Sequence, residues 1–83
     1  MTFYRFMMRN HRGENTPAGN LAADMYRDRE RFPKNGPYKF EGWHRLIREH
    51  LLRDGACPER MCVFEDCWED YVKCEKSKLS RRS

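Results

Sequence analysis

The stretch FEDCWEDY, residues 64–71, decides the fold class of this 83-residue chain. Met61, Phe64, Trp68 and Tyr71 recur at the spacing i, i+3, i+7 and i+10, which places them on one face of an α-helix, with the acidic residues on the opposite face. Outside this stretch, Ile, Val and Thr are rare, whereas Arg, Glu, Lys, Leu and Met are common. Strands favour β-branched residues and helices favour the second group. The sequence therefore predicts an all-α protein.

Three further helices are expected before this stretch. Thr2 is a candidate N-cap for a helix over residues 2–10, and Thr16 followed by Pro17 fits the N-cap and first position of a second helix that ends near Phe32. A third helix is expected over residues 39–53 and a fourth over residues 58–76, either continuous or divided after Cys62. The residues expected to form the structural core are Phe3, Phe6, Trp43, Ile47, Phe64, Trp68 and Tyr71.

The length of the chain allows one small domain. We expect residues 1–76 to form a single helical domain and residues 77–83 to form a basic, disordered tail, because this last segment is made of Ser, Lys and Arg with one Leu. No run of about 20 apolar residues is present, so we expect no membrane span. The N-terminal residues lack the pattern of a signal peptide, so we expect a cytoplasmic location.

Three stretches of the chain resemble the YozE family of small bacterial proteins. They are FYRFM at residues 3–7, FPK at residues 32–34, and the 64–71 stretch, and their order and spacing match over roughly residues 2–73. The resemblance implies a compact bundle of four or five short helices with a sterile-alpha-motif-like (SAM-like) fold, no enzyme activity and no cofactor. The function of the family is uncharacterised. This chain departs from the usual pattern in its four cysteines and its basic tail.

The cysteines and histidines predict neither a metal site nor a catalytic site. Cys57, Cys62, Cys67 and Cys74 lack the CxxC spacing that lets two thiolates hold one zinc ion, so we expect reduced thiols, with Cys67 in the core. His44 and His50 share a helix but lie six residues apart, which is not the i, i+4 spacing of a metal-binding pair. We therefore expect no cofactor, no metal and no enzymatic activity.

Charge is segregated along the chain and marks the candidate partner-binding residues. The net charge is −3 over residues 61–74 and +3 over residues 75–83, within a total of +4. Two basic groups accompany the acidic face of the fourth helix, one on the first helix and one on the third. The candidate residues are Glu65, Asp66, Glu69 and Asp70 on the acidic face, Arg5, Arg9 and Arg12 on the first helix, and Arg45 and Arg48 on the third.

These faces support three hypotheses about function, besides the interpretation that they are ordinary solvated surfaces. The first is a small non-enzymatic interaction module that binds a protein partner through its charged helix faces, because complementary charge steers association and selects partners. The second is a nucleic-acid-binding protein that uses the Arg5, Arg9 and Arg12 stripe together with the basic tail. The third is a phage or mobile-element protein that inhibits a host protein.

Overall fold

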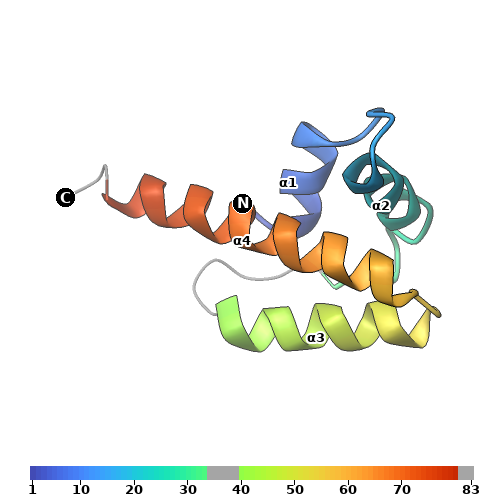
Figure 1. Ribbon diagram of the computed structural model, residues 1–83. Helices are drawn as coiled ribbons and strands as arrows, with labels where there is room; N and C mark the ends of the chain where they lie inside the picture. Colours follow the sequence, from blue (N-terminus) through green and yellow to red (C-terminus); the bar gives the residue numbers. More distant parts are fainter. Residues whose placement is uncertain (34–39, 81–83) are drawn as a thin grey trace.

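The computed structural model describes residues 1–33 and 40–80, and this part of the chain contains four α-helices and no strand. They are α1 (Phe3–Asn10), α2 (Pro17–Arg27), α3 (Phe40–Arg53) and α4 (Pro58–Ser80). Figure 1 shows α1 and α2 on one side of the long helix α4 and α3 along its other side. The predicted all-α fold class is confirmed, and the fourth helix is continuous through Cys62.

Two threonine caps begin the first two helices as the sequence indicates. The Thr2 side chain accepts a hydrogen bond from the backbone N–H of Arg5 (3.1 Å), and the Thr16 side chain accepts one from the backbone N–H of Gly19 (3.0 Å). Pro17 occupies the first turn of α2, where its missing N–H costs nothing. These side-chain oxygens satisfy donors that the first helical turn would otherwise leave unpaired.

Two turns and one close approach of the backbone depend on glycine. Gly13 after α1 and Gly55 after α3 have φ angles of 85° and 84°, in the left-handed region that other residues rarely adopt. Gly19 lies inside α2 in an ordinary conformation, but a Cβ atom at this position would collide with the backbone oxygen of Glu14. The turn that joins α1 to α2 therefore lies directly against the α2 backbone.

Aromatic rings fill the centre of the molecule. The Phe3 ring is fully buried, and its centroid lies 5.6 Å from that of Phe64, 5.1 Å from Trp68 and 5.6 Å from Tyr71. The Tyr71 hydroxyl donates a hydrogen bond to the Met1 carbonyl oxygen (2.6 Å), which gives this buried polar group a partner. The buried apolar residues are Phe3, Phe6, Met7, Leu21, Ala22, Met25, Phe32, Ile47, Leu51, Phe64, Cys67, Trp68 and Tyr71.

Two aromatic residues differ from their expected places. Trp43, which the sequence placed in the core, is only partly buried and packs against the core from the edge. Among the described helices α3 packs against α4 alone. Phe32, which the sequence assigned only to the end of a helix, is buried between Tyr4 and His50, with centroid distances of 6.1 and 5.5 Å.

The C-terminal part of α4 extends beyond the boundary that the sequence suggested. The backbone is helical to Ser80, although residues 77–80 were expected to begin a disordered tail. Residues 34–39 and 81–83, which include most of the expected loop before α3 and the end of the expected tail, lie outside the described residues. None of the helices in the described part of the chain is long and apolar enough to cross a bilayer.

Candidate functional site

The exposed side of α4 carries three neighbouring carboxylates, Asp66, Glu69 and Asp70, which we call the acidic face. None of the three forms an ion pair or a side-chain hydrogen bond within the described part of the chain. Many other carboxylates do, namely Glu14, Asp24, Asp28, Glu49, Asp54, Glu65 and Glu75. Asp66 and Asp70 stand at i, i+4, a like-charge spacing that slightly destabilises a helix. The acidic face therefore presents concentrated charge that is not neutralised internally.

Glu65 does not belong to this exposed set. Its carboxylate oxygens lie 3.0 and 2.8 Å from Nε2 of His44, so the side chain is directed toward α3. The sequence placed Glu65 with the other acidic residues, opposite the aromatic stripe. Residue 65 actually lies about 100° from Phe64 around the helix, at the border between the two faces, where a neighbouring helix can reach it.

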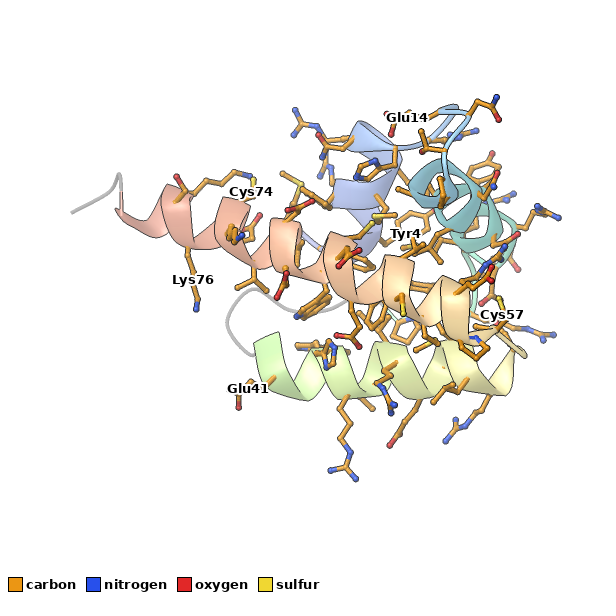
Figure 2. All side chains as sticks on the ribbon, viewed as in Figure 1. Tyr4, Glu14, Glu41, Cys57, Cys74 and Lys76 are labelled. Atoms are coloured by element: carbon orange, nitrogen blue, oxygen red, sulfur yellow. The ribbon has the colours of Figure 1, made fainter. Side chains whose placement is uncertain are left out.

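The acidic face also acts on the buried side of α4. The pKa of the Cys67 thiol is raised from 9.0 to about 11, chiefly by burial and then by the negative charges of Asp70, Asp66 and Glu14. The thiol therefore stays protonated at neutral pH and behaves as a small apolar side chain. Cys57 and Cys62 are exposed, and Cys74 is partly buried. Figure 2 shows Cys57 and Cys74 at widely separated places along the molecule.

The basic residues on the first helix do not form one continuous stripe. Arg5 and Arg9 are exposed on α1, but the helix ends at Asn10, so Arg12 lies in the following turn. The Arg12 guanidinium stacks on the Tyr26 ring of α2, 3.8 Å from its centroid. Arg5, Arg9 and Arg12 would lie on one face only if the helix continued to residue 12. The helix ends before that residue, and Gly13 in the following turn has a positive φ, which is typical of a helix end.

A second guanidinium lies near the same tyrosine. Arg29 is 4.5 Å from the Tyr26 centroid, so two cations share one aromatic ring. The candidate basic residues of α3 differ from each other, because Arg45 pairs with Glu49 at 3.4 Å whereas Arg48 is simply exposed. Two arginines, one from the α1–α2 turn and one from the segment after α2, therefore lie at the same ring.

A separate cluster of polar side chains lies where α2 and α3 end. Nε2 of His50 is 2.5 Å from Oδ2 of Asp28, which caps α2, and 3.4 Å from Oδ2 of Asp54, one turn further along the chain. A cavity of about 440 Å³ adjoins the two carboxylates. Other residues that line it include Met25, Leu51, Cys57 and Arg60. Arg60 is paired with Asp24, so its charge is already neutralised.

Sequence reasoning missed this cluster for two different reasons. His50 and Asp54 stand at i, i+4, a spacing that was visible in the sequence but was tested only between histidines. Asp28 lies 22 residues before His50 in the sequence and meets it only through the tertiary fold. None of the cysteines joins a set of three convergent metal-ligand side chains among the residues described.

These helices and surfaces define a small SAM-like helical module with exposed charged faces. A family model described as the YozE SAM-like fold matches residues 2–73, and the chain belongs to this YozE family. No curated protein and no solved structure matches the chain at a significant level.

Proposed function

We propose that this protein is a non-enzymatic interaction module that binds a basic surface of a protein partner through its acidic face. The observation that carries the proposal is that Asp66, Glu69 and Asp70 are adjacent, exposed and without an internal ion pair in the described chain. Like charges held together in this way repel one another, and a basic partner relieves that repulsion. A host protein inhibited by a phage or mobile-element product would be one such partner.

The packing of α4 on the side opposite the acidic face supports the same proposal. The opposite side of α4 carries Phe64, Trp68 and Tyr71, all buried in the aromatic core. The backbone that presents the carboxylates is therefore fixed before a partner arrives, and less conformational entropy is lost on binding. Lys73 is an exposed cation one turn beyond Glu69 on the same side of α4. Lys73 weakens the negative field of the acidic face, so removing its charge should strengthen the binding of a basic partner.

Charge-neutralising variants with a matched control test the proposal in affinity capture from the native host. The test variant is Asp66→Asn/Glu69→Gln/Asp70→Asn. The control, Glu30→Gln/Glu41→Gln/Glu59→Gln, removes the same charge from exposed sites elsewhere, and Figure 2 shows Glu41 directed away from α4. Glu65 is left unchanged because it bonds to His44.

We expect the wild-type protein and the control to retain a partner that the test variant loses. Lys73→Gln should retain more of the same partner, and added salt should release it, since exposed charges are screened over about 10 Å at 0.1 M. Equal recovery of every partner by the test variant and the control would exclude the acidic face as the binding surface. Circular dichroism of each variant shows whether the helices are intact.

Nucleic-acid binding is a second candidate, and one observation favours it. Arg12 and Arg29 both stack on Tyr26, which combines two phosphate-binding groups with an aromatic ring. Nuclease treatment during the capture experiment separates the two candidates. If Arg12 and Arg29 each neutralise a phosphate, Arg12→Gln/Arg29→Gln should make the slope of log K against log salt shallower by about 1.8 for duplex DNA. An unchanged slope excludes this site.

A further inference from the structure

We propose that Asp28, His50 and Asp54 form a binding site for a zinc ion at the ends of α2 and α3. One ligand atom from each of these side chains lies within 4.8 Å of the other two. Each comes from a defined backbone position: Asp28 caps α2, His50 lies in the last turn of α3, and Asp54 follows that helix. The three donors therefore converge on one point from two helix ends.

The donor spacing is close to that of a tetrahedral zinc site. Zinc binds histidine nitrogen at about 2.0–2.1 Å and carboxylate oxygen at about 2.0–2.2 Å, so two donors on one ion stand roughly 3.3–3.5 Å apart. The distance of 3.4 Å between Nε2 of His50 and Oδ2 of Asp54 meets this requirement. The distance of 2.5 Å between His50 and Asp28 is shorter, so Asp28 must move outward by about 1 Å.

The chemistry of the donors selects the ion. One imidazole with two carboxylates is a mixed nitrogen and oxygen set, which suits zinc and related first-row transition metals. Mg²⁺ and Ca²⁺ prefer oxygen ligands alone and so fit this set less well. Two carboxylates also balance the charge of a divalent cation, and the positive charge of Arg60, which lines the same cavity, is paired with Asp24.

The surroundings of the cluster leave room for further ligands of the ion. Asp28 and Asp54 line the cavity of about 440 Å³, so a metal between them has water-accessible space on that side. The Phe32 ring meets the His50 ring edge to face, with centroids 5.5 Å apart, and holds the imidazole orientation. A metal here would tie the end of α3 to the end of α2, two helices that, within the described residues, do not pack directly against each other.

Calorimetric titration with zinc chloride tests the proposal in a chain that carries Cys57→Ser, Cys62→Ser and Cys74→Ser. These substitutions remove the three cysteines that are not buried and would otherwise compete for zinc. We expect one zinc ion to bind per chain. Asp54→Asn should weaken zinc binding about tenfold or more. Even the mutation of a residue that only hydrogen-bonds to a metal ligand lowers metal affinity about 10- to 100-fold. The Asp54 side chain is 55% exposed, so this variant should keep its fold.

Two matched controls separate the site from general charge effects. Glu49→Gln removes the same charge from α3, the helix that carries His50, and His44→Gln removes a histidine that also faces a carboxylate. Both should bind zinc as the parent does. Co²⁺ in place of zinc should give visible ligand-field bands without a thiolate charge-transfer band.

Any of three results would overturn the proposal. They are no zinc binding in the cysteine-substituted chain, equal affinity of the Asp54→Asn variant and the parent, and weakening by Glu49→Gln as large as that by Asp54→Asn. The first would mean that His50 is simply the hydrogen-bonding partner of Asp28 and Asp54. Circular dichroism of the Asp54→Asn variant confirms that a loss of binding is not a loss of fold.

Discussion

The two sides of α4 are held together by different interactions. On one side, α1 and α2 pack through buried rings and methionines, with Phe3, Met7 and Leu21 fully buried. On the other side, α3 contributes Ile47 and Leu51 as buried apolar residues and leaves Leu46 and Leu52 half exposed. Trp43 packs at the edge of the core, and α3 is also attached by polar contacts, from His44 to Glu65 and from His50 to Asp28. Figure 1 shows the same division, with α3 lying alone along its side of α4.

This difference implies unequal local stability. Buried apolar area stabilises a fold by about 25 cal/mol per Å², whereas a half-exposed ion pair contributes about 1 kcal/mol or less because water can replace either partner. We therefore expect α3 to open before the α1, α2 and α4 assembly does. Native-state hydrogen exchange would show this as faster exchange of the α3 backbone amides.

The largest expected effect is the loss of a ring at the centre of the aromatic core. Phe3→Ala should lower the free energy of unfolding by about 3–5 kcal/mol, because the Phe3 ring is fully buried and lies against four other rings, those of Phe6, Phe64, Trp68 and Tyr71. Trp43→Ala, in the partly buried second turn of α3, should cost clearly less. Urea unfolding followed by circular dichroism measures both. An equal cost for the two variants would contradict the division between the two sides.

The next largest effect is a loss of stability at alkaline pH, which arises from the ionisation of Cys67. Its pKa is raised from 9.0 to about 11 in the folded protein, so the fold favours the protonated thiol. Below pH 9.0 both states keep the proton and this contribution is constant. As the pH rises toward about 11 the unfolded thiol ionises first, so the free energy of unfolding falls, by about 2–3 kcal/mol at most.

Cys67→Ala isolates this contribution from the other groups that titrate in the same range. The variant loses packing at every pH, but its free energy of unfolding should fall less steeply above pH 9.0 than that of the parent. Urea titrations of both proteins across this range give the comparison. Parallel curves would show that the pKa of Cys67 is the same in the folded chain as in the unfolded one.

A smaller effect, of opposite sign on the two sides of α4, comes from the helical glycines. Gly19→Ala should destabilise by about 1–3 kcal/mol, because the new Cβ meets the backbone oxygen of Glu14. Gly42→Ala in α3 should stabilise by about 0.5–1 kcal/mol, because open space surrounds that position and alanine favours a helix. Thermal melting of the two variants measures the signs. A neutral Gly19→Ala would mean that the α1–α2 turn lies more loosely on α2 than the structure shows.

The smallest effect concerns the polar attachment of α3. A double-mutant cycle with His44→Gln and Glu65→Gln should give a coupling of about 0.5–1 kcal/mol, because the Glu65 side chain is 47% exposed and therefore screened. Glu65→Gln should also speed hydrogen exchange in α3 more than in α1. A coupling near zero with unchanged exchange in α3 would show that the contact between His44 and Glu65 does not stabilise the attachment of α3.

The helices of the fold were predictable because their signals are local. Thr16 followed by Pro17 begins α2 in the structure as it does in the sequence, and the stripe of Phe64, Trp68 and Tyr71 is buried. Phe32 was harder to place, because the pattern of α2 ends before it and its burial depends on Tyr4 and His50 from other parts of the chain. Periodicity identifies core residues within helices and says little about those between them.

The candidate sites were predictable only in part. The exposure of Asp66, Glu69 and Asp70 follows from their position opposite the aromatic stripe. The contact between Glu65 and His44 could not be predicted in this way, because residue 65 lies at the edge of the aromatic stripe and the neighbouring helix determines its environment. Arg12 left the predicted basic stripe because α1 ends earlier than a continuous i, i+7 pattern requires.

By itself, the sequence determined the all-α class, the threonine caps, most of the aromatic core and the separation of charge along the chain. These features depend on interactions within a few residues, since a helix repeats every 3.6 residues and a cap lies next to its helix. Only the tertiary structure placed His44 against Glu65, stacked two arginines on Tyr26 and joined Asp28 to His50. Except for Arg29 on Tyr26, which are three residues apart, each of these contacts joins segments that meet only after the helices have packed, and no spacing along the chain encodes it.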